Sequence, residues 1–351
     1  MEQLHKLPDA LLPWYAANRR DLPWRQDKDP YHIWVSEVML QQTRVEAVKG
    51  YYTRFLQELP TISDLAECGD YWLHKLWEGL GYYTRVRNLR KAAQQIMTEY
   101  NGQFPTEYAQ ILALPGIGEY TAGAICSIAF NQPTPAVDGN VLRVISRLTD
   151  DPTPIDLPAY KKAVKEKLAA IYPEQAGDFT QALMELGATV CGPNRQPDCE
   201  NCPCRDFCLG FQRKTAQSLP VRLTKRERKM EEKTVFILSC DGMYALEERG
   251  DAGLLAGLWQ FPNVQDKLDA QAALKQVERY DLKPTEILFQ VERKHIFTHK
   301  EWRMRGFYIE VQNCGGNFKW MSEIDIGLQA ALPTAFRLFL PEDKLKNFTK
   351  N

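Results

Sequence analysis

The 351-residue chain lacks several features that would assign it to a large class of proteins. It contains no run of roughly eighteen apolar residues, so we expect no membrane-spanning helix and no membrane partner. Residues 1–10 lack a basic stretch followed by an apolar one, so we expect no secretory signal. Lys and Arg number 44 and Asp and Glu number 45, so the net charge of −1 does not indicate a nucleic-acid partner. Any functional assignment must therefore come from motifs.

Nine cysteines are present, and five of them fall between positions 191 and 208. Their pattern is Cys191-x7-Cys199-x2-Cys202-x5-Cys208, with Cys204 as an additional thiol. A secreted disulfide framework would be shorter and more evenly paired, so the cluster indicates metal ligation. Zinc sites usually repeat Cys-x2-Cys or include His, and no His lies nearby, so the spacing favours a [4Fe–4S] cluster over zinc. Cys204 is an alternative ligand to Cys202.

The periodicity of apolar residues divides the chain into three parts. Helical spacing dominates residues 1–211, and it is clearest at Ile33–Leu40, Val86–Met97, Thr121–Ala129, Val141–Leu148 and Phe179–Val190. Residues 212–233 hold eight cations against three acids, which is typical of an exposed basic linker. Beyond them we expect strands at Thr234–Ser239 and Arg305–Val311 and a helix near Asp269–Val277. The sequence thus predicts a multidomain protein, with an all-α domain (1–211), a linker (212–233) and an α+β domain (234–345).

Two short motifs and one buried acid suggest a reactive site. Gly116 and Gly118 flank an apolar residue before a helix, whose N-terminus favours an anion such as phosphate, although many structural turns share this pattern. Asp138 opens a later helix, where an ordinary N-cap is an equally good interpretation. Glu37 is surrounded by apolar residues on every side of its predicted helix. Such a carboxyl tends to have a raised pKa and can hold a proton near neutral pH.

These features occur in an order that resembles one known family. The matching motifs are Trp24-Arg25, Ser36–Thr43, Gly79–Tyr83, the Gly116–Gly118 hairpin, Val137–Asn140 and the cysteine box. The chain resembles the helix-hairpin-helix DNA glycosylases and, within them, the MutY adenine DNA glycosylases. Relatives with lyase activity carry a Lys as a Schiff-base nucleophile where this chain has Tyr120. A phenol forms no imine with an aldehyde, so we expect a monofunctional enzyme.

The resemblance implies a hydrolase that removes adenine mispaired with 8-oxoguanine or guanine in double-stranded DNA and so initiates base excision repair. Glu37 is expected to act as the general acid and Asp138 to stabilise or trap the sugar cation, with Tyr120 and Asn140 positioning Asp138 and the sugar. The family pattern places further adenine and DNA contacts at Arg20, Leu22, Trp24, Arg25, Gln42, Tyr82, Gly116, Gly118 and Glu185. The rival interpretations are a bifunctional thymine-damage glycosylase, a damage-binding protein and an iron–sulfur electron carrier.

The C-terminal domain supports the same branch of the family. Residues 253–262 resemble the signature of a Nudix-like domain, and residues 295–299 resemble its 8-oxoguanine reader, through His295, Phe297, Thr298 and His299. Family members commonly have Ser where this chain has Thr298, and a buried strand with incidental histidines is the alternative interpretation. The resemblance assigns the [4Fe–4S] cluster to Cys191, Cys199, Cys202 and Cys208, with one more residue after Cys191 than usual. It further implies a monomer in the bacterial cytoplasm, associated with the nucleoid.

Overall fold

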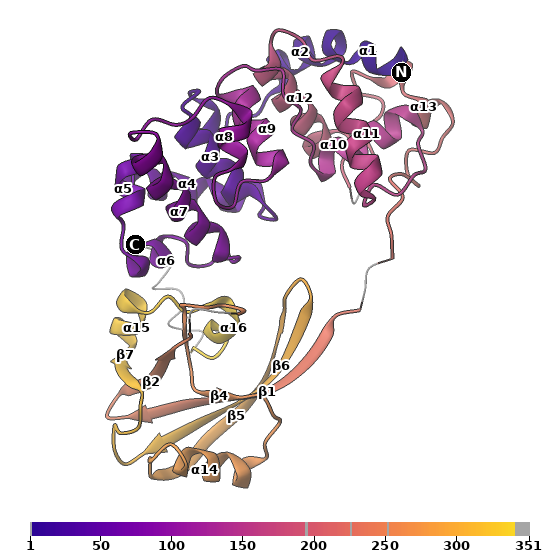
Figure 1. Ribbon diagram of the computed structural model, residues 1–351. Coiled ribbons are helices and arrows are strands. Elements are labelled where there is room, and N and C mark those ends of the chain that lie inside the picture. The colour runs from indigo at the N-terminus through magenta and orange to yellow at the C-terminus, as the bar shows by residue number, and fades with distance from the viewer. Residues whose placement is uncertain (1, 194–195, 225–226, 251–252, 341–351) are drawn as a thin grey trace. The chain divides into compact units, whose positions relative to one another are not determined.

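The protein, described by a computed structural model over residues 2–193, 196–224, 227–250 and 253–340, forms two compact units (Figure 1). The first unit runs to Cys68 and resumes from Arg87 to the gap at 225–226. The second unit combines Gly69–Val86 with the described residues after that gap, so it is discontinuous in sequence. Among the described residues, no helix has both the length and the apolar character that a bilayer crossing requires.

The first unit is entirely helical within the described residues, as the sequence predicts. Its elements are α1 (Glu2–His5), α2 (Leu7–Asn18), η1 (Pro23–Arg25), α3 (Pro30–Leu40), α4 (Val45–Glu58), α5 (Ile62–Glu67), most of α7 (Thr84–Glu99), α8 (Tyr108–Leu112), α9 (Glu119–Ile128), α10 (Gly139–Thr149), α11 (Pro158–Ala169), α12 (Ala176–Thr189), η2 (Arg205–Phe207) and α13 (Leu209–Gln212). Helices α3, α7, α9, α10 and α12 confirm the five helices expected from apolar spacing.

Helix α10 illustrates how the sequence builds this unit. Asp138 caps its N-terminus by accepting a hydrogen bond from Val141 N at 2.8 Å. Its apolar face joins residues of α2, α11 and α12 in one buried cluster, to which Val144, Leu11 and Phe179 contribute. Asp138 is the N-cap of α10, and α10 packs into this buried cluster. The packing of the helix therefore fixes the position of the Asp138 carboxylate.

The predicted hairpin lies between α8 and α9, and its two glycines have different roles. Gly116 has a φ of +78°, and a Cβ there would lie 2.6 Å from Asn88 Cβ, so only glycine fits without strain. Gly118 is the N-cap of α9 with an extended backbone, and a Cβ there would meet nothing within 4 Å. Gly116 thus shapes the turn, whereas Gly118 leaves open space at the helix N-terminus.

The second unit is built on a mixed sheet whose described strands follow the order β3-β2-β1-β6-β5, with β4 beside β1 and β7 beside β2 (Figure 1). The strands are β1 (Lys229–Cys240), β2 (Met243–Glu248), β3 (Trp259–Gln260), β4 (Asn263–Val264), β5 (Pro284–Ile296), β6 (Lys300–Val311) and β7 (Lys319–Ser322). Its helices are α6 (Asp70–Leu76), α14 (Ala270–Glu278), α15 (Glu323–Gln329) and α16 (Thr334–Arg337). The predicted strands at 234–239 and 305–311 and the helix near 269–277 are confirmed.

Strands β1 and β6 run parallel through the middle of the sheet and separate two cores. Val235 and Ile237 face a cluster that includes Phe336, whereas Phe236 and Leu238 face the cluster that includes α14. Side chains on both faces of β1 are therefore buried, which explains its nearly continuous apolar run. The result is the α+β layering expected for this half of the chain.

Strand β1 begins at Lys229, inside the segment 212–233 that the sequence suggested was an exposed linker. Glu231 is buried, and its carboxylate accepts hydrogen bonds from Lys300 Nζ at 2.7 Å and Trp302 Nε1 at 3.0 Å. Lys233 is buried too, with its ammonium 4.7 Å from the centre of the Trp302 ring. Charge alone therefore misjudged these residues. Residues 225–226, and 341–345 of the predicted second domain, lie outside the described residues.

Candidate active site

A pocket of about 510 Å³ opens in the first unit between η1, α3, α9, α10 and α12. Ten of the residues predicted from the sequence line it together: Arg20, Leu22, Trp24, Arg25, Glu37, Gln42, Tyr120, Asp138, Asn140 and Glu185. They come from segments separated by as many as 165 positions in the chain. Their convergence on one cavity is therefore a property of the fold and not of local sequence.

Glu37 lies on α3 at the wall of this pocket and is almost fully buried, with 5% of its surface exposed. Burial, with a smaller contribution from the nearby Asp138, raises its pKa from 4.5 to about 7, against a hydrogen bond from Tyr120 and the charge of Arg25. The Tyr120 hydroxyl donates that bond to Glu37 Oε2 at 2.6 Å. The carboxyl is thus held in one orientation and populates its protonated form near neutral pH.

Asp138 is the N-cap of α10, and its carboxylate is held by two donors. Val141 N donates to one carboxylate oxygen at 2.8 Å and Asn140 Nδ2 to the other at 2.7 Å. Burial raises the pKa of Asp138, while these hydrogen bonds act in the opposite direction. Asn140 Oδ1 in turn accepts from Arg143 at 2.8 Å, which fixes the amide with its NH₂ group toward Asp138.

Glu185 on α12 has a different environment from Glu37, although it too is buried. Arg20 binds both of its oxygens, at 2.6 and 2.9 Å, and Arg25 donates to it at 2.8 Å. Burial raises the pKa of Glu185, but the two guanidinium groups outweigh it and lower the pKa to about 2. The pocket therefore contains one carboxyl adapted to carry a proton and one that is permanently ionised.

Several residues at or beside the pocket were not predicted from the sequence, and three of them contact or flank predicted residues. Gln181 and Met184 on α12 line it beside Glu185, and Arg143 on α10 holds Asn140. Helical spacing contained a usable signal, because Gln181 precedes Glu185 by four residues and so shares its face. Arg143 had a signal of the same kind, because it follows Asn140 by three residues on α10.

Two predicted DNA contacts have unusual backbone conformations. Gln42, which follows α3, has a φ of 59°, and Tyr82, which precedes α7, has a φ of 48°. Non-glycine residues adopt this region at a cost of roughly 1–3 kcal/mol and tend to do so at functional sites. Gln42 lies at the pocket in the first unit, whereas Tyr82 belongs to the second unit and is 47% exposed.

The predicted reader residues lie at the turn between β5 and β6. His295 is in β5, and Phe297–His299 form the connection, which Phe297 N closes by donating to Lys300 O at 2.8 Å. Phe297 packs its ring on His295 and Trp302, at centroid distances of 4.5 and 4.7 Å. The Thr298 hydroxyl is hydrogen-bonded to the Tyr82 hydroxyl, so the second unit brings together two residues that the sequence places far apart.

The four cysteines expected to bind the cluster line one small cavity between α10, η2 and α13. Arg147 crosses this site, donating to Cys191 Sγ at 3.2 Å and accepting from Cys208 Sγ at 3.6 Å through its carbonyl oxygen. Cys204 does not line the cavity and is instead buried in the helical core, with 2% of its surface exposed. Cys202 therefore lines the cavity and Cys204 does not, although their side chains are hydrogen-bonded to each other.

The separation of these sulfur atoms distinguishes between metal groups. In the parts of the chain that are described, no three of them lie within 4.8 Å of one another. Four Zn–S bonds of about 2.3 Å would hold sulfurs about 3.8 Å apart around a single ion. At this spacing no three sulfurs of the described cysteines lie close enough to bind one zinc ion together.

Comparison with known proteins places this geometry in a family. Residues 35–172 match the HhH-GPD superfamily of base excision DNA repair proteins, and residues 234–342 match the NUDIX domain. An adenine DNA glycosylase from Homo sapiens is 33% identical, over 94% of this chain and 73% of that protein. The chain belongs to the adenine DNA glycosylase family. The resemblance to MutY enzymes inferred from the motifs is therefore confirmed.

A second adenine DNA glycosylase and one solved structure are also similar to this chain. The Arabidopsis thaliana adenine DNA glycosylase is 35% identical over 90% of this chain, and the chain spans 58% of that protein's length. Among solved structures, a thermostable thymine-DNA glycosylase is 29% identical, with a TM-score of 0.54, and covers 60% of this chain and 98% of its own. This structure covers part of the chain only and shows the fold of that part.

Proposed function

We propose that the chain hydrolyses the bond between adenine and deoxyribose in double-stranded DNA and thereby initiates base excision repair. The observation that supports this most strongly is the pairing of Glu37 and Asp138 in one pocket, one carboxyl with a pKa near 7 and the other bound by two donors. Cleavage of this bond needs a proton for the departing base and a negative charge for the sugar cation. The adenine must also leave the base stack to enter the pocket.

In this mechanism Glu37 donates its proton to N7 of adenine. The base then departs with the electron pair of its bond to C1′, leaving a cationic sugar. Tyr120 holds Glu37 through the bond from its hydroxyl, and it is the residue that stands in place of a lyase lysine. Without an amine at that position no imine forms, so the reaction ends in hydrolysis.

Asp138 is proposed to stabilise the sugar cation with its carboxylate or to bond to C1′ before water replaces it. The hydrogen bonds from Val141 N and Asn140 favour the ionised form that either role requires. Water then adds to C1′ and releases a proton, which restores the acid form of Glu37. Trp24 and the ion pairs of Arg20 and Arg25 with Glu185 shape the cavity that would receive adenine.

We further propose that the substrate duplex pairs adenine with 8-oxoguanine, or less favourably with guanine, and that the protein acts as a cytoplasmic, nucleoid-associated monomer. His295, Phe297, Thr298 and His299 would contact the oxidised base, and Gln42 and Tyr82 would fill the space beside it. Tyr82 is exposed and hydrogen-bonded to Thr298, an arrangement suited to an inserted aromatic wedge. Gly116 and Gly118 would let the start of α9 approach a phosphate.

We propose that Cys191, Cys199, Cys202 and Cys208 hold a [4Fe–4S] cluster. Such a group would crosslink the 191–208 segment to the end of α12 and to α13 when bound. Arg147 would donate to the Cys191 thiolate, as it does to the sulfur here. The proposed hydrolysis requires no electron transfer, so the role assigned to these four residues is structural.

The proposal is tested by single-turnover excision on duplexes that contain adenine opposite 8-oxoguanine, adenine opposite guanine, or a damaged thymine. We expect adenine release from the first two, faster with 8-oxoguanine. The variants Glu37→Gln and Asp138→Asn should each nearly abolish release while duplex binding persists. Wild-type rates in either variant would remove that residue from the mechanism.

Borohydride treatment on an abasic duplex distinguishes the bifunctional alternative. Borohydride reduces an imine to a stable crosslink, and the monofunctional mechanism forms no imine. We expect no trapped complex with the wild-type protein, and trapping in a Tyr120→Lys variant would serve as the positive control. Efficient trapping of the wild type would assign the chain to lyase chemistry instead.

A further inference from the structure

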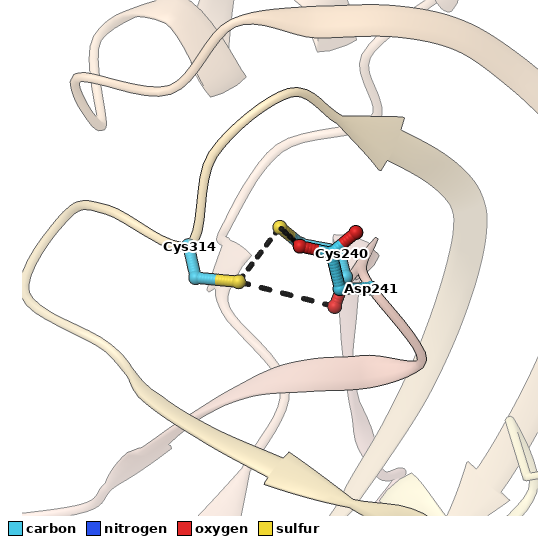
Figure 2. A group of neighbouring side chains, drawn as sticks. All are labelled: Cys240, Asp241 and Cys314. Atoms are coloured by element: carbon cyan, nitrogen blue, oxygen red, sulfur yellow. Dashed lines mark hydrogen bonds between the residues drawn. The ribbon is translucent and has the colours of Figure 1, made fainter.

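A second pair of thiols lies in the sheet unit, away from the cysteine box in sequence. Cys240 is the last residue of β1 and is buried, whereas Cys314 is exposed in the connection between β6 and β7. The Cys314 thiol donates to Cys240 Sγ at a sulfur–sulfur distance of 2.7 Å, and Figure 2 shows the two sulfurs directed at each other. The proposed glycosylase mechanism uses neither residue.

The backbone on both sides of this pair is held in place. Cys240 pairs with Met243 across the tight turn Asp241-Gly242, where both turn residues have positive φ. In the other segment, Gln312 N donates to Lys283 O at 2.9 Å, and Gly315 O accepts from Trp320 Nε1 at 3.0 Å. Cys314 is therefore anchored by its neighbours on either side, and the approach of the two thiols is built into the fold.

The same site contains a carboxylate, so a metal site is the alternative to a covalent pair. Cys240, Asp241 and Cys314 place their ligand atoms within 4.8 Å of one another, and the Asp241 carboxylate lies 3.9 Å from Cys240 Sγ. Two thiolates on one zinc ion, however, would lie about 3.8 Å apart, which is farther than these sulfurs. A disulfide needs about 2.05 Å, so the observed 2.7 Å is the closer match to a covalent pair.

We propose that Cys240 and Cys314 are a redox modification site, which a peroxide converts from a dithiol into a disulfide. The exposed Cys314 thiolate attacks one peroxide oxygen, the O–O bond breaks, and Cys314 becomes a sulfenic acid as hydroxide leaves. The Cys240 sulfur then attacks the Cys314 sulfur and releases water. In total two thiols and one hydrogen peroxide yield one disulfide and two waters. The hydrogen bond from Cys314 raises the pKa of Cys240, so Cys240 is poorly ionised and the first attack on peroxide is assigned to the exposed Cys314.

The test uses the full-length protein, reduced and then treated with hydrogen peroxide before the remaining thiols are alkylated. Trypsin places Cys240 in the peptide 234–249 and Cys314 in the peptide 306–319. We expect mass spectrometry to recover these two peptides linked, two hydrogens lighter than their sum, and separate again after reduction. Recovery of both peptides unlinked, alkylated or oxidised singly, would overturn the proposal.

Three variants control the experiment. Cys314→Ser should abolish the linked pair, whereas Cys68→Ser, which removes a partly exposed thiol of the first unit, should leave it unchanged. Asp241→Asn should also leave the link intact, because its carboxylate takes no part in disulfide chemistry. Zinc that copurifies with the wild type, is lost in Asp241→Asn and Cys314→Ser, and blocks alkylation of Cys240 would replace the disulfide with a metal site. This inference does not rest on the proposed glycosylase activity.

Discussion

Glu37 holds a proton that an exposed glutamate would have lost, and this carries a cost in stability. Its pKa is about 7 in the folded protein against an ordinary 4.5, so between these pH values the folded state binds more protons than the unfolded state. Stability therefore decreases as the pH rises from 4.5 toward 7, by a full amount on the order of 3 kcal/mol. The raised pKa that suits Glu37 to its proposed catalytic role therefore lowers the stability of the folded protein at neutral pH.

We predict that Glu37→Gln loses excision and gains stability together. The amide carries no charge to desolvate, so the free energy of unfolding should exceed that of the wild type by on the order of 3 kcal/mol near pH 8, with no gain near pH 4. Urea unfolding at the two pH values measures this difference. Equal stability of variant and wild type near pH 8 would contradict the raised pKa.

The pH dependence of excision offers a second test of the same group. Because Glu37 is proposed to act in its protonated form, the single-turnover rate should fall about tenfold per pH unit above pH 7. Tyr120→Phe removes the hydrogen bond that lowers the pKa of Glu37, so the falling limb should move to higher pH. If the fall in rate occurs at the same pH in Tyr120→Phe as in the wild type, another group controls the rate.

At the residue scale, the sequence predicted which residues line the pocket better than it predicted their hydrogen-bond and ion-pair partners. The apolar neighbours of Glu37 were sufficient to expect a raised pKa, and residues 20–25 and 185 came from the family pattern. The bidentate ion pair between Arg20 and Glu185 could not be predicted, because it joins positions 165 apart through the packing of α12. Contacts across such separations depend on tertiary structure and leave no local pattern.

Among the elements, the hairpin before α9 allows its two glycines to be tested separately. Gly116→Ala should destabilise the protein by about 1–3 kcal/mol, because of its positive φ and the contact with Asn88. Gly118→Asp should fold normally, since Asp is a good N-cap and the site is open, but its charge should weaken DNA binding at least about tenfold. Gly118→Ser is the uncharged control, and unchanged binding by Gly118→Asp would remove this helix end from the DNA interface.

The segment that carries the cysteines offers another matched pair. Cys202→Ser should reduce or abolish the visible absorbance near about 400 nm expected of a four-iron cluster with thiolate ligands. Cys204→Ser should keep it, because Cys204 lies in the helical core and not at the cavity, at a cost of about 1 kcal/mol in stability. The reverse result would make Cys204 the ligand, and a colourless wild type with stoichiometric zinc would replace the cluster.

Element boundaries show where local patterns were informative. Helices with a strong apolar stripe, such as α10, were placed to within a few residues of their ends. The start of β1 was not, because Glu231 and Lys233 are charged and yet buried against Lys300 and Trp302 of β6. Charge suggests exposure only until a partner strand supplies the opposite charge or an aromatic face.

At the scale of the whole molecule, the division into two units allows the proposed recognition of the mispair to be tested separately from base removal. The sequence placed the end of the helical domain at residue 211, but Leu219 O accepts from Arg147 and Val221 O accepts from Ile155 N, so residues up to that point belong to the helical unit. Truncation after Lys225 should therefore leave slow adenine release and remove the preference for 8-oxoguanine. Single-turnover rates on the two mispairs measure this, and an unchanged ratio would exclude Phe297–His299 as the reader.

The discontinuity of the second unit has a consequence for how the chain comes apart. A nick at 225–226 severs the backbone there, but the N-terminal fragment still carries Gly69–Val86. That segment keeps its bonds to the other fragment, including Leu332 N to Glu78 Oε1 at 3.3 Å and the Tyr82–Thr298 pair. We therefore expect the two fragments to elute together as one complex. Neither fragment alone contains every part of the sheet unit.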